Sequence, residues 1–249
     1  MLLNVHHDIE RYQFMPKIRT TLIYTVAVAA LMCSFAVLPA YGQEESVKPG
    51  INSGFTDDLD VGTFLTIFET ESRAIYKHRN DLVAAMALKP GMNVADIGAG
   101  TGFFSAMMAK SVGPKGKVYA VDIAKNFLVH INENAKAEGI KNIKTVHCDN
   151  RSTGLKKNSI DFAYICDVYH HFEYPYSTME SLHAAMRPGG ILLIVDFERI
   201  KGISREWTLG HVRCGKGTVA DEVKDAGFDL IEEIPMMEEQ YILKFKKRG

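Results

Sequence analysis

The sequence predicts an α/β fold in which helices cover both faces of a mostly parallel, doubly wound sheet. Short apolar runs typical of buried strands alternate with helical patterns from about residue 88 to the C-terminus, and this alternation indicates a parallel sheet. A glycine-rich turn directly follows the first of these runs, and the last two runs are joined by only a few residues. Because so short a link allows only antiparallel pairing, we expect one antiparallel strand pair at the end of the sheet.

The expected elements follow from the apolar spacing. Residues 62–88 carry apolar side chains at helical intervals, which predicts one long or two short helices ahead of the sheet, forming an N-terminal helical lid. The predicted strands are residues 93–97, 117–123, 143–147, 160–168, 191–197, 229–234 and 240–245. The predicted helices between them are residues 101–112, 124–138, 176–186 and 218–226, with stop signals at Lys89-Pro-Gly91, Gly139, Pro188-Gly-Gly190 and Gly227.

The first 42 residues have the parts of a secretory signal peptide. Lys17 and Arg19 precede an apolar run over residues 22–38, and small residues lead up to Gly42, after which we expect cleavage. The alternative is an uncleaved membrane anchor formed by residues 22–38, a run slightly shorter than the ~20 residues that span a bilayer. The pattern predicts an exported protein, periplasmic or secreted, whose mature chain has no membrane span.

Three further segments complete the domain organisation. Met15 stands directly before the signal pattern, which places residues 1–14 upstream of a possible second start. Residues 43–60 are polar and rich in turn-forming pairs, and we interpret them as a linker. Residues 61–249 form the folded domain, including the N-terminal helices.

The composition excludes some classes of partner. The formal net charge is −1 with no excess of one sign, so no clustered basic face is expected and no nucleic-acid partner. After cleavage, Cys148, Cys166 and Cys214 remain, and an odd count without paired spacing argues against a disulfide framework. We expect free thiols that act as small buried hydrophobes, and no metal site.

The segment from Val94 to Phe103, Val-Ala-Asp-Ile-Gly-Ala-Gly-Thr-Gly-Phe, is the strongest single motif. It predicts a buried strand, a glycine turn that lets the backbone approach a ligand, and a helix whose first N–H groups face that ligand. The spacing is G-x-G-x-G, whereas a dinucleotide fingerprint requires G-x-G-x-x-G, with its last glycine at Phe103. The carboxylate of Asp96 beneath the turn would repel a pyrophosphate and suits a cationic, amine-bearing ligand.

This acid-x-Gly-x-Gly-x-Gly turn after a strand resembles motif I of class I S-adenosylmethionine (SAM)-dependent methyltransferases. The resemblance extends from about residue 88 to the C-terminus. It implies a Rossmann-like, seven-stranded sheet of order 3-2-1-4-5-7-6 with the last-inserted strand antiparallel, and SAM as the cofactor. The residues that it places at the cofactor in this turn are Asp96, Gly98, Ala99, Gly100, Thr101 and Gly102.

Polar residues at the ends of later strands complete the expected cofactor site, because ligands bind at the carboxyl ends of parallel strands. Asp122, followed by Ile123, can accept both ribose hydroxyls, and the alternative is that Asp122 caps the following helix. The resemblance places Asp149, with Asn150 in reserve, against the adenine amino group. It also places the segment around Asp167 beside the sulfonium and the acceptor.

That segment, Cys166-Asp-Val-Tyr-His-His-Phe172, lacks the Asn/Asp-Pro-Pro-Tyr signature of many nucleic-acid methyltransferases. It is more similar to the small-molecule group that includes ubiquinone/menaquinone-type and arsenite-type enzymes. His170 or His171 could serve as a general base where the acceptor must lose a proton, and the alternative is that one of them packs or caps the next turn.

Two further segments are expected to face the acceptor. In the entry helix, Arg73 could pair with the methionine carboxylate of the cofactor and Tyr76 could cover the methyl group. The loop over residues 198–217 is long for an α/β connection, and long loops are often functional. The acceptor-binding candidates in these regions and after the fourth strand are Tyr169, Arg199, Trp207, His211 and Arg213.

We therefore expect an enzyme that methylates a small-molecule or lipid-like acceptor. Two alternatives stay open at this point. The first is a non-catalytic protein that binds SAM in the same pocket. The second is a thiol-dependent metalloid methyltransferase, which requires the sulfurs of Cys148, Cys166 and Cys214 to converge near the sulfonium.

Overall fold

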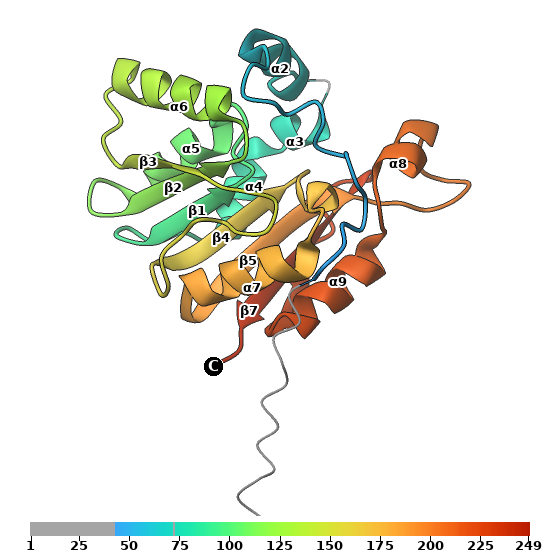
Figure 1. Ribbon diagram of the computed structural model, residues 1–249. Coiled ribbons are helices and arrows are strands. Elements are labelled where there is room, and N and C mark those ends of the chain that lie inside the picture. Colours follow the sequence, from blue (N-terminus) through green and yellow to red (C-terminus); the bar gives the residue numbers. More distant parts are fainter. Residues whose placement is uncertain (1–42, 72) are drawn as a thin grey trace, which may run out of the picture. The chain divides into compact units, whose positions relative to one another are not determined.

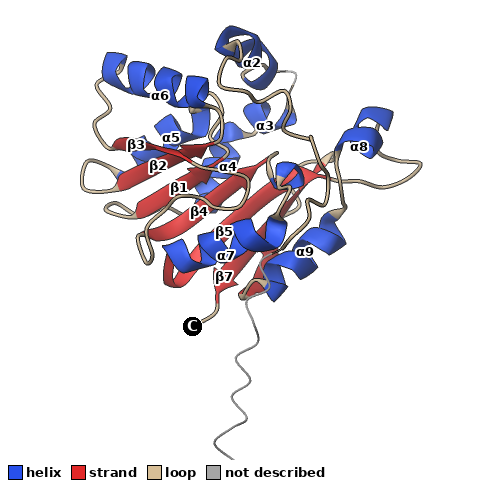
Figure 2. Cartoon of the chain, viewed as in Figure 1, coloured by secondary structure: helices blue, strands red, loops and turns tan. Residues whose placement is uncertain are grey.

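The computed structural model describes residues 43–71 and 73–249, so the predicted signal peptide lies outside the described residues. The described chain forms a seven-stranded sheet of order β3-β2-β1-β4-β5-β7-β6, as predicted (Figures 1 and 2). Strands β1 to β5 pair in parallel, and β7 runs antiparallel to both β5 and β6. The strands are Asn93–Ile97 (β1), Lys117–Asp122 (β2), Ile143–His147 (β3), Ile160–Cys166 (β4), Met186–Phe197 (β5), Phe228–Glu233 (β6) and Gln240–Lys247 (β7).

The central strands are buried on both faces, which explains their continuous apolar sequences. Along β4, Phe162 and Tyr164 point into one core cluster while Ala163 and Ile165 point into the other. The first cluster is covered by α4 (Arg79–Met86) and α5 (Phe103–Val112), and α6 (Lys125–Ala137) packs beside them on β2 and β3. The second is covered by α7 (Pro175–Ala185) and α9 (Lys216–Asp225), which lie together near β5 in Figure 1.

The N-terminal helices are three in number within the described residues, where one or two were predicted. They are α2 (Val61–Phe68), α3 (Ala74–Lys77) and α4, and the backbone of His78 leaves the helical region between the last two. The carboxylate of Asp60 caps α2 by accepting the backbone N–H groups of Gly62 and Thr63. Phe64 of α2 packs edge-on against Phe127 of α6.

Residues 43–60, predicted as a linker, lie against the domain. The backbone N–H of Val47 donates to the carbonyl of Glu173 at 2.9 Å, and the side chain of Asn52 donates to the carbonyl of His171 at 3.0 Å. The segment has no helix or strand over residues 43–60, and some of its polar groups bond to the domain while many of its residues stay exposed.

Two other elements differ from prediction. Strand β5 begins at Met186, before the expected stop at Pro188-Gly-Gly190. Met186 pairs with Ile160 and Ile191 with Phe162, so the residues between bulge out of the ladder, and a proline is tolerated there. The long loop after β5 contains a short helix, α8 (Glu206–His211). Of the helices in residues 43–249, none combines the length and the apolar character needed to cross a bilayer.

Candidate active site

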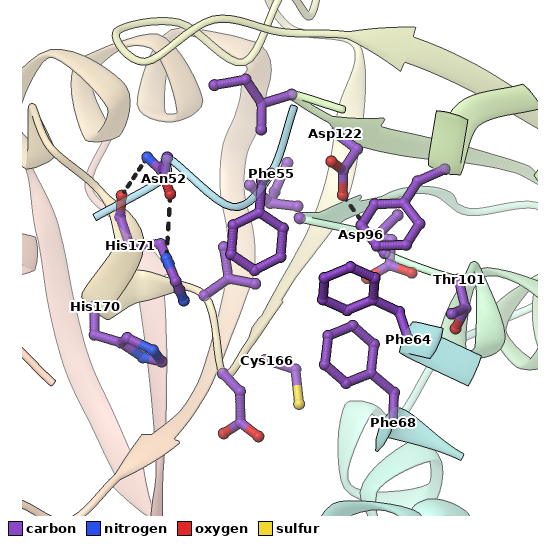
Figure 3. Close-up of a pocket in the computed structure, with 18 of the residues that line it drawn as sticks. Asn52, Phe55, Phe64, Phe68, Asp96, Thr101, Asp122, Cys166, His170 and His171 are labelled. Carbon is purple, nitrogen blue, oxygen red and sulfur yellow. Dashed lines mark hydrogen bonds between the residues drawn. The ribbon is translucent and has the colours of Figure 1, made fainter. Parts of the chain in front are cut away.

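A cavity of about 430 Å³ opens at the carboxyl ends of β1, β2 and β4 (Figure 3). The chain order reverses here, because β1 lies between β2 and β4, and such switch points are where open α/β sheets bind ligands. The glycine turn lines one side of the cavity, and Asn52 and Phe55 of the N-terminal segment line another.

The turn requires glycine for steric reasons. Gly98 has a φ of +70°, and a Cβ there would lie 2.5 Å from the side chain of Val168. Gly102 has a φ of +80°, and a Cβ there would lie 2.5 Å from Ile131. The left-handed backbone at Gly102 also explains why α5 begins at Phe103 and not at Thr101. The turn can therefore pack closely on α6 and still present its backbone to the cavity.

Two buried carboxylates lie beneath this turn. Asp96 accepts a hydrogen bond from the Ser105 hydroxyl at 2.7 Å, and burial, reinforced by Asp122, raises its pKa to about 7. Asp122 accepts the N–H of Gly100 at 2.8 Å and that of Ala124 at 2.9 Å, and burial raises its pKa as well. Each oxygen of Asp122 has a further lone pair, so tying the turn to α6 leaves capacity for ligand hydroxyls.

Asp167 follows β4 and holds a strained conformation. Its φ is +51°, which is unusual for a residue other than glycine. Oδ2 forms an ion pair with Arg73, whereas buried Oδ1 has no hydrogen-bond partner among residues 43–71 and 73–249. Burial raises the pKa of Asp167 to about 6, and the positive charge of Arg73 limits this rise because it favours the ionised carboxylate. An unpartnered carboxylate oxygen at a cavity wall suits a cationic ligand group.

Three histidines form the opposite end of the cavity. His170 and His171 lie on a 3₁₀ turn after β4 (Tyr169–His171), and His211 ends α8. The Nε2 atoms of His171 and His211 are 3.3 Å apart, and Nδ1 of His170 lies 2.7 Å from a carboxylate oxygen of Asp196 on β5. Burial lowers the pKa of His171 to about 3, and the neighbouring rings of His170 and His211 add smaller contributions in the same direction. This ring is therefore neutral.

Aromatic rings separate the two ends. Phe55 lies between His171 and Asp122 in Figure 3, and the rings of Phe64 and Phe68 continue from it below Asp122, with successive ring centroids 5.5 and 5.3 Å apart. The indole of Trp207 stacks on the His211 ring, with centroids 4.8 Å apart and an interplanar angle of 18°. The middle of the cavity is therefore apolar and suited to a flat ring.

Comparison with known proteins decides the family. Residues 88–237 match the family model of the methyltransferase domain. The chain belongs to this methyltransferase family. A SAM-dependent methyltransferase from Aquifex aeolicus superposes with a TM-score of 0.67 at 23% identity, covering 76% of this chain and all of that one. The cyclase SpnF shares the fold with a TM-score of 0.61 at 15% identity, over 70% of this chain and 81% of that one.

Among sequence relatives, the demethylmenaquinone methyltransferase of Geobacillus stearothermophilus is 28% identical over 120 residues. That of Listeria welshimeri is 28% identical over the same length. Each match covers 48% of this chain and 51% of the relative, so the chain spans about half the length of these relatives. The expectation of a class I SAM-dependent methyltransferase with SAM as cofactor is thus confirmed.

The methyltransferase cavity brings together most of the residues predicted for cofactor and catalysis. Its lining includes Arg73, Tyr76, Asp96, Gly98, Ala99, Gly100, Thr101, Asp122, Ile123, Asp149, Asn150, Asp167, His170, His171, Trp207 and His211. The buried carboxylates and the unpartnered oxygen of Asp167 fit a ligand with an ammonium group and ribose hydroxyls. Arg73, expected at the cofactor carboxylate, faces the cavity while paired with Asp167.

Four predicted residues lie outside the cavity lining. The hydroxyl of Tyr169 donates to Glu222 at 3.0 Å, and Arg213 forms a two-pronged ion pair with the same carboxylate. Arg199 donates to the carbonyls of Leu209 and Val212 at the end of α8. These contacts stabilise the loop over residues 198–217 and its packing on α9, so the predicted substrate contacts of these three residues have no support from geometry. The fourth, Gly102, packs against α6 as described above.

The thiols do not converge. Cys148 and Cys166 line the cavity but Cys214 does not, and all three are free. Burial raises the pKa of Cys148 to about 12 and that of Cys214 to about 11, so both remain protonated and poorly nucleophilic. Sequence reasoning missed Asn52, Phe55 and Asp196 as site residues, because the first two lie in the predicted linker and Asp196 lies inside a strand.

Proposed function

We propose that this methyltransferase methylates a small, largely apolar, ring-bearing acceptor that carries an O–H, S–H or N–H group facing the histidines. One observation carries the proposal: the cavity has a carboxylate-lined glycine turn at one end, histidines at the other, and aromatic walls between. SAM supplies an electrophilic methyl group on a positively charged sulfur. The protein must hold that group in line with the acceptor atom, and positioning supplies much of the rate.

The carboxylate end is suited to hold the cofactor. Asp122 has lone pairs left for the ribose hydroxyls, and the neutral form of Asp96 gives way to the charged form when a cation binds nearby. Oδ1 of Asp167 is available to the methionine ammonium group. Arg73 keeps Asp167 charged and lies where it can also meet the carboxylate of the cofactor.

The histidine end is suited to accept a proton. Asp196 receives a hydrogen bond from Nδ1 of His170, which leaves Nε2 of that ring as an acceptor. The acceptor proton moves to this nitrogen. The electron pair left on the acceptor, on the deprotonated atom or on a ring carbon conjugated with it, forms the bond to the methyl carbon, and the electrons of the broken C–S bond remain on sulfur. Tyr76 lies at the cavity wall against Phe103, at 5.0 Å between ring centroids, and this position supports the proposal that it covers the methyl group.

The class of acceptor is supported by wall chemistry and by the relatives. Phe55, Phe64, Phe68 and Trp207 offer ring faces that favour a planar apolar molecule. The matched relatives are named for methylation of demethylmenaquinone. We infer a phenol- or quinol-like acceptor for this chain.

A SAM-binding protein without turnover is the alternative that the experiment must separate. The His170–Asp196 pair favours an enzyme, since a binding pocket needs no oriented base. The thiol-dependent metalloid alternative is disfavoured because Cys214 lies outside the cavity.

We also propose that the domain works outside the cytoplasm. The basic residues Lys17 and Arg19, the apolar run 22–38 and the small residues before Gln43 support export. SAM is made in the cytoplasm, so an exported enzyme requires a supply of SAM in its own compartment.

The test uses SAM with a trideuterated methyl group. The purified protein is incubated with quinols, phenols, thiols, amines, arsenite and a lipid extract, and products are analysed by mass spectrometry. We expect label in a phenol or quinol. SAM binding by calorimetry together with no labelled product from any class would favour the binding protein, and label in arsenite alone would restore the metalloid alternative.

A further inference from the structure

The three histidines of the cavity come from distant parts of the chain and converge on one point. His170 and His171 follow β4, and His211 lies 40 positions later at the end of α8. One ring nitrogen from each lies within 4.8 Å of the others. The ring centroids of the three pairs are 4.4, 5.2 and 5.0 Å apart.

The protein fixes the tautomer of two of these rings. The Asn52 amide donates from Nδ2 to the carbonyl of His171, so its Oδ1 faces Nδ1 of the same residue at 3.1 Å. Since Oδ1 can only accept, Nδ1 carries the proton and Nε2 presents a lone pair. Asp196 imposes the same tautomer on His170, because its carboxylate accepts from Nδ1.

His211 completes the cluster and is held by other contacts. Its ring stacks on Trp207, and its backbone carbonyl, with that of Gly210, accepts hydrogen bonds from the ammonium group of Lys48. The lone pair on Nε2 of His171 thus faces Nε2 of His211 at 3.3 Å, and a ring nitrogen of His170 lies within 4.8 Å of both rings. This contact can be made either by a hydrogen bond from Nε2–H of His211 or by a metal ion that binds the nitrogens of the cluster.

We propose that His170, His171 and His211 together bind one divalent transition-metal ion of the zinc class. Imidazole is a preferred ligand of such ions, and three protein ligands with one open position are typical of catalytic zinc. Two nitrogens each about 2.0–2.1 Å from a tetrahedral ion are about 3.3 Å apart, which equals the observed His171–His211 separation of 3.3 Å. The ring nitrogens of the three histidines lie within 4.8 Å of one another, so the His170 ring must rotate slightly toward the other two to bind the same ion.

The surroundings are those of a metal site. Metal-binding histidines commonly donate their other N–H to a carboxylate or an amide oxygen, which orients the ring. Asp196 does this for His170 and Asn52 does it for His171. Asp196 also accepts the backbone N–H groups of His170 and Phe197, at 3.0 and 2.7 Å, so its position is firmly set.

The role of the ion, unlike its binding, rests on the proposed function. The open position would face the cavity that also holds the glycine turn. An acceptor O–H or S–H bound there loses its proton to water more readily, because the ion stabilises the resulting anion. Its lone pair then forms the bond to the methyl carbon, and the electrons of the C–S bond remain on sulfur. A ring nitrogen that binds the ion cannot accept the proton, so in the metal-loaded protein the ion replaces the imidazole base.

The test measures metal binding without any acceptor. The full mature protein, made without a polyhistidine tag and stripped with a chelator, is titrated with Zn²⁺ by calorimetry and with Co²⁺ by visible absorption. We expect one ion per chain, the visible bands of tetrahedral Co²⁺ with nitrogen ligands, and no response to Mg²⁺. We expect His171→Ala and His211→Ala to weaken Zn²⁺ binding at least tenfold.

Further variants separate this site from a general loss of structure. Asp196→Asn keeps all three ligands and should weaken binding by about 10–100-fold, as for other outer-sphere partners. The control His130→Ala removes a half-buried histidine on α6 that bonds to Asn134, and it should bind Zn²⁺ like the parent. Circular dichroism checks that every variant is folded.

The outcomes are distinct. Stoichiometric Zn²⁺ binding that survives both His171→Ala and His211→Ala, or no binding above that of Mg²⁺, overturns the metal site. Either result leaves the proposed methyl transfer untouched, because SAM binding and labelled product are measured separately. Metal binding without any methyl transfer would instead support the site and contradict the proposed function.

Discussion

Nδ1 of His170 lies 2.7 Å from Oδ1 of Asp196, and the two side chains are only 3% and 1% exposed. The imidazole is therefore fixed in orientation and tautomer before any ligand arrives. The ring belongs to the cluster that lines the cavity with His171 and His211. A buried polar pair of this kind is costly without satisfied hydrogen bonds, and Asp196 meets that cost by accepting three N–H groups.

The first prediction concerns His170. We expect His170→Ala to lower methyl transfer by about 10²–10⁴-fold, because it removes the group that receives the acceptor proton or binds the activating ion. SAM affinity should change less than twofold, since the carboxylate end of the cavity is left intact. Rates come from single-turnover transfer of labelled methyl, and affinities from calorimetry.

His130→Ala, which removes a half-buried histidine of α6 outside the cavity lining, is the matched control for this measurement. Parental turnover in a folded His170→Ala protein would show that positioning alone drives the reaction. A parallel loss of SAM affinity would instead mean that His170 supports the whole cavity.

The second prediction concerns Asp122 and the cofactor. Asp122→Ala should lower SAM affinity at least tenfold, because charge-assisted hydrogen bonds are worth about 1.5–3 kcal/mol. Asp122→Asn keeps an acceptor for the N–H of Gly100 or Ala124 and should lose less. Calorimetry with SAM, S-adenosylhomocysteine and NAD measures this, and NAD should not bind.

Asp221→Ala, at an exposed position of α9, serves as the control for loss of a carboxylate. Unchanged SAM affinity in Asp122→Ala would restrict Asp122 to tying the glycine turn to α6. NAD binding tighter than SAM binding would contradict the assignment of the turn.

The third prediction concerns pH and stability. The pKa of Asp96 rises from 3.8 to about 7 in the folded protein, so the folded state favours the neutral carboxyl. This contribution to stability is complete below pH 4 and is lost as pH rises to about 7. The Asp96→Asn variant has no group that ionises here and so does not lose this stability as pH rises. The difference in free energy of unfolding, variant minus parent, should therefore increase by up to roughly 4 kcal/mol between pH 4 and 7.

Urea unfolding at several pH values measures this difference, and Asp221→Asn should show none. The pKa of Asp167 is also raised, to about 6, so this residue adds a smaller pH dependence to the free energy of unfolding. That contribution is the same in parent and variant and cancels in the difference between them. A difference that stays flat from pH 4 to 7 would mean that Asp96 is already ionised in the folded protein.

Much of the fold could be predicted from the sequence because its signals are local. The limits of β1 and β3, at residues 93–97 and 143–147, are as predicted, since turn residues flank both runs. The start of β5 was missed because a bulge, which no local pattern reveals, admits Pro188 into the strand. Helix α8 was missed because its six residues carry too few apolar positions to show a period.

The site was predicted less completely, for a physical reason. The glycine turn and the carboxylates sit at strand ends, where topology alone brings them together. His211 was assigned to acceptor binding, but its convergence with His170 and His171 depends on the path of a long loop. Arg213 was assigned to substrate because its partner, Glu222 on α9, could not be recognised as buried from sequence.

The last prediction concerns the N-terminus of the mature protein. We expect N-terminal sequencing to begin at Gln43, because Gly42 ends the predicted signal peptide. The chain contacts the domain from Gln43 onward. The side-chain amide of Gln43 donates to the carbonyl of Glu173 at 3.3 Å, and the backbone carbonyl of Gln43 accepts a hydrogen bond from Arg151. The same segment brings Asn52 and Phe55 to the cavity, so cleavage a few residues later would still spare the site.

Residues 1–42 fused to a reporter that is active only outside the cytoplasm should give activity, and replacement of Leu31 by Arg within the apolar run should abolish it. A cytoplasmic protein that starts at Met1 or Met15 would contradict export and would remove the need for SAM outside the cytoplasm.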